Sequence, residues 1–155
     1  LPEAIFTSSV FVEQGDVVVE TRSRTEGDAT YRAIGGNIET PPMVVLVNRN
    51  TASAAEILAA ALQTDKDAPL VGTRTYGKGV FQQVLKLNNG GSLDLTVGEF
   101  LTAEGVSLAG TGLKPDVHAP LPKDATRDVQ LNRAFQVLSG EVAEAGSAEA
   151  DDSGQ

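Results

Sequence analysis

The spacing of hydrophobic residues alternates between the periods of strands and helices. The apolar run over 43–47 (MVVLV) predicts a strand buried on both faces, as in a parallel sheet covered by helices. Residues 54–64 (AAEILAAALQT) give the strongest helix prediction, because Ala and Leu dominate and the larger apolar side chains share one stripe. A strand over 69–72 follows, so residues 43–72 predict a β–α–β unit with a right-handed crossover.

Further elements are predicted on both sides of this unit. Residues 80–87 and 92–97 flank the sequence NNGG, which indicates a β-hairpin. Residues 126–138 predict an amphipathic helix that ends at Gly140 and directs five residues to the core: Val129, Leu131, Ala134, Phe135 and Leu138. The other predictions are a helix over 3–12, strands over 17–24 and 30–34, and an extension of the sheet over 99–108. The pattern as a whole predicts an α/β fold.

Composition excludes several classes of function. A chain of 155 residues fits one domain or part of one. Without Cys and with a single His, it offers no disulfide framework, thiolate zinc site or His cluster, so we expect no metal and no cofactor. A net charge of −9 argues against nucleic acid as a partner. The longest apolar run is far below the roughly 18 residues of a membrane span, and the start at Leu1 lacks a signal-peptide pattern.

The last 15 residues differ from the rest of the chain. Residues 141–155 hold five acidic side chains, no Lys or Arg, and one large aliphatic residue, Val142. So little apolar surface does not offset the entropy lost on ordering, and we therefore predict a folded part over 1–140 and a disordered acidic tail over 141–155. An acidic interaction tail is the alternative interpretation.

Ser53 lies where the buried strand meets the strongest helix, and two interpretations are open. With Glu56 it fits the S-x-x-E capping box, which would make it a structural residue. Alternatively, its hydroxyl is a nucleophile at a helix N-terminus, where free N–H groups and the helix dipole stabilise an oxyanion. The backbone N–H of Ala54 would then be one oxyanion donor, and Thr51 would cap the helix instead.

A nucleophilic serine needs a base, and the sequence offers two candidates. His118 is the only imidazole and is most simply a surface or satisfied core residue. A lysine kept neutral by burial or by neighbouring positive charge is the other route. Lys78 lies between Gly77 and Gly79, which let the backbone approach a neighbour closely. Taken alone, a lysine in such a loop is usually solvated.

Family resemblance changes this balance. Four motifs follow one another along the chain: NRNTASAAE at 48–56, LVG at 70–72, TYGKG at 75–79 with the following Gln82, and GLKPDV at 112–117. In this order and spacing they resemble the C-terminal processing (tail-specific) proteases, which are Ser/Lys peptidases with a ClpP/crotonase-like core. The resemblance covers about residues 1–138. It implies the C-terminal part of such a core, with a mixed sheet flanked by helices, a β-hairpin and a C-terminal helix.

The resemblance also assigns roles to residues. It makes Ser53 the nucleophile, Lys78 the general base, and Gln82 a residue that orients the lysine or the substrate, whereas Pro115 and Asp116 would be structural. The implied reaction passes through an acyl-enzyme. Because the base must be neutral, we expect the Lys78 amine in an active conformation to be buried within hydrogen-bond reach of Ser53. A lysine pointing into solvent would indicate an inactive state or a wrong alignment.

The implied partners are the C-termini of protein or peptide substrates, with an extracytoplasmic location (periplasm, cell envelope or secreted). Self-association, and membrane association of the full-length protein, stay open.

The sequence departs from the family in two respects. Some members have an Asp at the end of the nucleophile helix, where this chain has Thr64 followed by Asp65. The family's D-L-R-x-N-x-G-G segment, which supplies the second oxyanion donor, and its PDZ domain would both lie upstream of Leu1. Losing one oxyanion donor lowers the rate by roughly 10²–10³-fold, so we expect this chain alone to hydrolyse little or nothing.

Two alternatives keep the fold but change the function. One is a non-catalytic relative that binds peptides by strand addition. The other is an acyl-CoA enzyme that uses backbone oxyanion donors without a Ser/Lys pair. The joint presence of Ser53, Lys78 and Gln82 argues against both.

Overall fold

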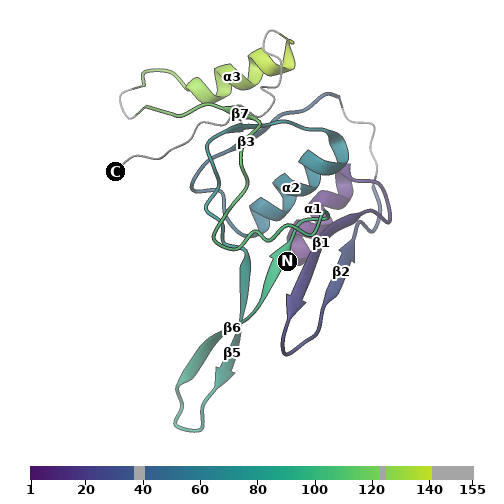
Figure 1. Ribbon diagram of the computed structural model, residues 1–155, viewed down its shortest axis with the longest axis vertical. Coiled ribbons are helices and arrows are strands. Elements are labelled where there is room, and N and C mark those ends of the chain that lie inside the picture. Colours follow the sequence, from purple (N-terminus) through teal and green to yellow (C-terminus); the bar gives the residue numbers. More distant parts are fainter. Residues whose placement is uncertain (37–40, 123–124, 141–155) are drawn as a thin grey trace.

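A computed structural model describes residues 1–36, 41–122 and 125–140 (Figure 1). In chain order the elements are α1 (Pro2–Phe11), β1 (Val17–Ser23), β2 (Ala29–Arg32), β3 (Val45–Val47), α2 (Ala54–Lys66), β4 (Leu70–Gly72), β5 (Val80–Lys86), β6 (Ser92–Leu101), β7 (Val117–His118) and α3 (Val129–Leu138). The α/β class is confirmed. The strands divide into an antiparallel sheet of order β2-β1-β6-β5 and a parallel sheet of order β3-β4-β7.

The predicted β–α–β unit is confirmed as β3–α2–β4. Strands β3 and β4 pair in parallel, with Val45 opposite Leu70 and Val47 opposite Gly72. Helix α2 lies in the middle of the molecule beside α1 (Figure 1), and its Ile57 is 2% exposed. The principal core also draws on β1, β4, β6 and the loops, through residues that include Val12, Val18, Val19, Leu70, Phe100 and Leu108. The N-terminus of α2, which carries Ser53, is thereby fixed to both sheets.

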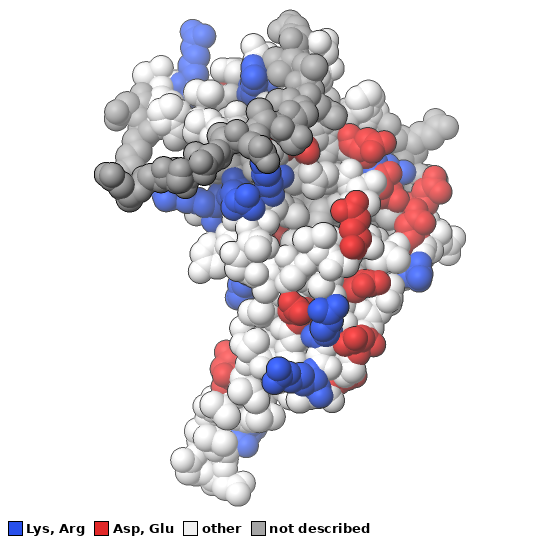
Figure 2. Space-filling model, in the orientation of Figure 1, with Lys and Arg blue, Asp and Glu red and all other residues white. Residues whose placement is uncertain are grey.

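The β5–β6 hairpin is confirmed and extends away from the rest of the protein (Figure 1). Its outer part exposes apolar side chains, among them Val84, Leu93 and Leu95, and shows little charge in Figure 2. Strand β6 ends at Leu101, so the predicted extension over 99–108 is only partly strand, followed by a turn and a single bridge from Leu101 to Ser107.

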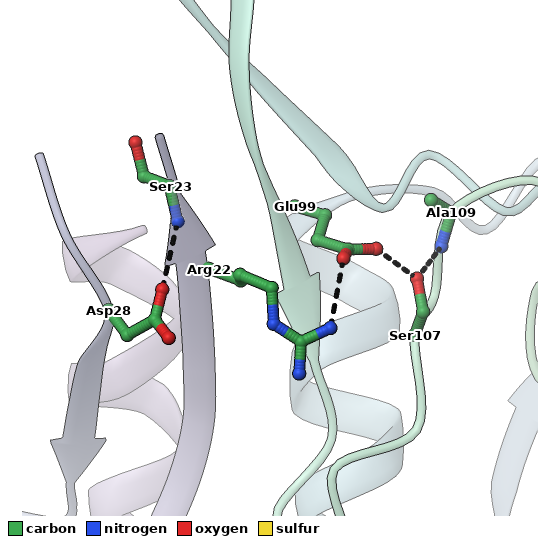
Figure 3. Close-up of polar contacts among 6 residues, drawn as sticks. All are labelled: Arg22, Ser23, Asp28, Glu99, Ser107 and Ala109. Carbon is green, nitrogen blue, oxygen red and sulfur yellow. Dashed lines mark hydrogen bonds and ion pairs between the residues drawn. The ribbon is translucent and has the colours of Figure 1, made fainter. Parts of the chain in front are cut away.

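Polar contacts fix the base of this hairpin (Figure 3). Glu99 on β6 lies 3.5 Å from the Arg22 guanidinium of β1 and accepts a 2.6 Å hydrogen bond from the Ser107 hydroxyl. The Ser107 oxygen in turn accepts the Ala109 N–H at 3.2 Å. The loop over 107–112 is therefore held against β6, and this loop supports the candidate site described below.

The terminal helix is confirmed as α3, but of the five residues predicted to face the core only Ala134 is buried. Gln130 and Ala134 are buried, whereas Phe135 is 60% exposed and Leu131 is 41% exposed. The helix packs on β3 and β4 through the face of Ala134, and the Gln130 side chain donates to the Ala119 carbonyl oxygen at 2.9 Å.

The predicted tail over 141–155 lies outside the described residues. None of the helices within the described ranges is long and apolar enough to cross a membrane.

Candidate active site

Ser53 lies at a sharp turn between β3 and α2. Its backbone has φ 56° and ψ −119°, a positive φ that is uncommon for a residue with a side chain. Such a conformation costs on the order of 1–3 kcal/mol and occurs preferentially at functional sites. The Ser53 N–H donates to Glu56 Oε2 at 2.9 Å, so the carboxylate half of the predicted capping box is present. The Ser53 side chain also meets the Glu56 N–H as the predicted capping box requires, although without a hydrogen bond of standard geometry.

The residues around Ser53 bear on both sequence interpretations. The Thr51 hydroxyl accepts the Asn48 N–H at 3.1 Å and thereby closes the preceding loop, so the expectation that Thr51 caps the helix is wrong. The N–H groups of Ala55 and Glu56 donate to backbone carbonyls, whereas that of Ala54 has no acceptor in the part of the chain that the structure describes. This arrangement suits the predicted oxyanion role of Ala54, which stays a prediction.

Lys78 lies on a loop that packs tightly against a second loop. A Cβ atom at Gly79 would overlap the backbone of Leu108 and Ala109, and one at Gly77 would lie 2.9 Å from the Gly112 nitrogen. The two loops are also hydrogen bonded, since the Gly110 N–H donates to the Gly77 carbonyl oxygen at 2.9 Å. The flanking glycines therefore permit the close backbone approach that the sequence predicted.

Glu56 joins the serine turn to the lysine loop, a role that sequence reasoning missed. Its side chain is fully buried. Oε1 accepts the Gly77 N–H at 2.8 Å and the Thr75 hydroxyl, while Oε2 accepts the Lys78 N–H at 2.9 Å. The only sequence signal was the S-x-x-E spacing, which predicts a local cap and gives no indication of partners about 20 residues away.

One cleft of about 410 Å³ brings the predicted residues together. Ser53, Lys78 and Gln82 all line it, and its other walls come mainly from β1, β2, β5 and β6, including Tyr31, Val80, Phe81 and Phe100. We refer to it as the Ser53 cleft. It combines a serine, a lysine and an aromatic wall, the mixture of polar and apolar groups typical of a ligand site.

The Lys78 amine does not have the buried position predicted for an active conformation. Lys78 and Gln82 are both exposed, and among the residues that the structure describes no hydrogen bond joins Lys78 to Ser53. The physical reason is hydration: a lysine side chain at an open cleft keeps its charged end in water unless another surface covers it. The backbone of the site is in place, but its lysine side chain is not.

The Ser53 cleft does not include the other candidate residues. Asp116 accepts the Leu70 N–H at 2.7 Å and the Gln63 side-chain amide at 2.9 Å, so it ties β4 to α2. Pro115 is buried beside it. His118 is exposed on β7 and lines a different cavity near α3, away from Ser53.

Asp65, at the end of α2, has an unfavourable environment. Burial raises its pKa, and the hydrogen bond and negative charge of Asp16 raise it further, while the Lys66 ammonium, 3.7 Å away, acts in the opposite direction. Its Oδ2 atom is buried without a hydrogen-bond partner in the described ranges. Because the pKa is higher in the folded state, this group favours folding at low pH, and that contribution is lost as the pH rises through the raised pKa.

We therefore expect Asp65→Asn to raise the free energy of unfolding at pH 7 by about 1 kcal/mol. The gain should shrink as the pH falls below the ordinary aspartate value. Urea denaturation at pH 7 and at a pH below the ordinary aspartate pKa measures the change. Asp94→Asn on the exposed hairpin serves as the matched control. An equal effect at both pH values would contradict the assignment.

A strained serine turn, a lysine loop and a shared cleft on an α/β framework define a candidate Ser/Lys hydrolase site. A family model for peptidase family S41 matches residues 1–119. The chain belongs to this family.

The similar proteins include several that are named C-terminal processing proteases. The carboxy-terminal-processing protease of Bartonella bacilliformis is 31% identical, over 94% of this chain and 42% of that protein. The carboxy-terminal processing protease CtpA of Bacillus subtilis is 38% identical, over 79% of this chain and 26% of that protein. A solved photosystem II D1 C-terminal processing protease superposes with a TM-score of 0.70 and 34% identity, over 88% of this chain and 35% of that one. The chain thus spans less than half the length of each of these relatives.

Proposed function

We propose that this chain is part of a serine endopeptidase that cleaves protein substrates near their C-terminus. The observation that carries the proposal is the joint placement of Ser53 and Lys78 on one cleft, with the backbones of both segments bound to the same buried carboxyl group. Family membership and the names of the relatives support it.

The proposed reaction is acyl transfer with a Ser/Lys dyad. Neutral Lys78 removes the Ser53 proton as the hydroxyl oxygen attacks the scissile carbonyl carbon. The Ala54 N–H stabilises the resulting oxyanion. Collapse of the tetrahedral intermediate breaks the peptide bond, and Lys78 returns the proton to the departing amine. Water, activated by Lys78, then hydrolyses the ester to release the acid and regenerate Ser53. Gln82 orients the lysine or the substrate.

In this mechanism the conformation described above is inactive, and we propose that the isolated chain hydrolyses little or nothing. Two conditions are missing. Lys78 is exposed, so its side chain must move out of water before it can act as a base. A second oxyanion donor, whose loss lowers rates by roughly 10²–10³-fold, would have to come from a segment other than the one that carries Ala54.

We further propose that the substrates are protein or peptide C-termini and that the full-length protein acts outside the cytoplasm, as the family resemblance implies. Self-association, and membrane association of the full-length protein, are hypotheses that rest on the resemblance alone. No cofactor takes part in the proposed steps.

Covalent labelling tests the proposal directly. A serine-reactive fluorophosphonate, applied to the full-length protein and mapped by mass spectrometry, should modify Ser53. Ser53→Ala should abolish the adduct, and Ser8→Ala, at a serine buried in α1, should leave it unchanged. Absence of the adduct at Ser53 in the folded full-length protein would contradict the proposal.

A non-catalytic peptide-binding relative is the second candidate, and one observation favours it. Strand β5 forms an edge of its sheet and lies exposed beside the Ser53 cleft. The backbone N–H and C=O groups along this edge can therefore form hydrogen bonds with an extended peptide. This candidate predicts peptide binding to the full-length protein without labelling of Ser53, which is the outcome that the labelling experiment distinguishes.

A further inference from the structure

The Glu56 carboxyl group is buried without a compensating cation. It has no exposed surface, and in the described part of the chain no Lys or Arg forms an ion pair with it. Burying such a group is costly unless hydrogen bonds replace its hydration. A helix cap alone would need a single bond, which a glutamate also provides at the surface. The complete burial of Glu56 therefore calls for an explanation beyond capping.

Four hydrogen bonds replace the lost hydration, and each carboxylate oxygen receives two of them. Oε1 accepts from Thr75 and Gly77, and Oε2 accepts from Ser53 and Lys78. Three of the donors are backbone N–H groups, which can only donate. The Thr75 oxygen already accepts the Leu113 N–H at 2.7 Å, which directs its own proton toward Glu56. Glu56 is thus an acceptor for all four partners.

These donors belong to the two segments that carry the proposed chemistry. Ser53 supplies its own N–H, and Lys78 supplies its own N–H, so one carboxylate oxygen holds both backbones. A further bond, from the Tyr76 N–H to the Thr51 carbonyl oxygen at 2.9 Å, also holds the two segments together. The backbones are fixed relative to each other even though the Lys78 side chain is exposed.

We propose that Glu56 is a positioning residue that locks the serine turn to the lysine loop. The Lys78 amine then reaches Ser53 by rotation of its side chain alone, with no rearrangement of the loop. The inference rests on the proposed function, because it concerns the same serine and lysine. Glu56 itself does not touch the reacting atoms.

The first experiment measures the lock without catalysis. Glu56→Gln keeps the size of the side chain but replaces one acceptor oxygen with an NH₂ group, which cannot accept. Amide hydrogen exchange, followed by NMR on the 155-residue chain, should accelerate about tenfold or more at Gly77 or Lys78, relative to the change at core amides such as Ile57. Asp116→Asn is the matched control, since this carboxylate also joins two elements but lies outside the Ser53 cleft. Equal exchange at Gly77 and Lys78 in the two variants would overturn the proposal.

The second experiment asks whether the lock serves the reaction. In the full-length protein, Glu56→Gln should lower kcat for cleavage of an unfolded protein by about tenfold or more, with KM little changed, whereas Asp116→Asn should leave kcat per folded molecule unchanged. Thr75→Ser, which keeps the hydroxyl donor, should retain kcat, and Thr75→Val should lower it. Equal kcat values in Glu56→Gln and Asp116→Asn would overturn the positioning role.

The two proposals fail in different ways. If Ser53 cannot be labelled, the proposed function fails, and the positioning role fails with it even where exchange shows that the lock exists. If Ser53 is labelled but exchange at Gly77 and Lys78 does not depend on Glu56, only the positioning role is wrong.

Discussion

Replacing Lys78 by Ala in the full-length protein should lower the rate of peptide cleavage by about 10³-fold. A general base contributes roughly 10²–10⁴-fold, and Lys78 is the only lysine or histidine side chain that lines the described cleft. The loss should appear in kcat, because the proposed role is proton transfer and not binding. Cleavage of an unfolded protein, followed by mass spectrometry of the products, measures the effect.

Lys78→Arg separates proton transfer from simple charge. Arginine retains the positive charge and the length of the side chain but stays protonated in proteins, so it cannot act as a base. We expect Lys78→Arg to be as inactive as Lys78→Ala, while both variants keep the stability of the parent protein. Retention of more than a tenth of the parent rate by Lys78→Arg would show that charge alone is sufficient and would exclude the dyad mechanism.

Gly79→Ala should lower the free energy of unfolding by about 3 kcal/mol, a large effect for one methyl group. The new Cβ would overlap the backbone of Leu108 and Ala109 and lie 2.7 Å from the Ala109 Cα. Backbone cannot move aside as a flexible side chain can, so the two loops must separate. The Phe100 N–H to Gly79 carbonyl bond, at 2.7 Å, would be strained as well.

Gly91→Ala is the matched control for this prediction. Gly91 lies in the exposed hairpin turn, and like Gly79 it does not have a positive φ. Its added Cβ would meet only side-chain atoms, the nearest being Asn89 Oδ1 at 3.2 Å. We expect its stability change to stay within about 0.5 kcal/mol. Urea denaturation of both variants gives the comparison, and similar effects at the two sites would contradict the close loop packing.

Most elements of the fold follow from local sequence. The run MVVLV, the Ala-rich helix and the NNGG turn each encode their structure within a few residues, so β3, α2 and the β5–β6 hairpin were predicted correctly in type and approximate position. The orientation of α3 was not predicted. Its apolar stripe includes Leu131 and Phe135, but the sheet meets the adjacent face with Gln130 and Ala134. Periodicity identifies an amphipathic helix, but it does not say which neighbour the helix meets.

For the candidate site, local sequence established which residue types stand at which spacing. It gave a serine before the strongest helix, a lysine between two glycines and an ordered set of motifs that implies a peptidase. How these residues meet depends on the folding of the whole chain. Three of the four hydrogen bonds to Glu56 join segments about 20 residues apart, and the tight packing of the lysine loop depends on the distant loop over 107–112. A buried carboxylate finds its donors through folding of the whole chain, so a local pattern showed Glu56 only as a helix cap.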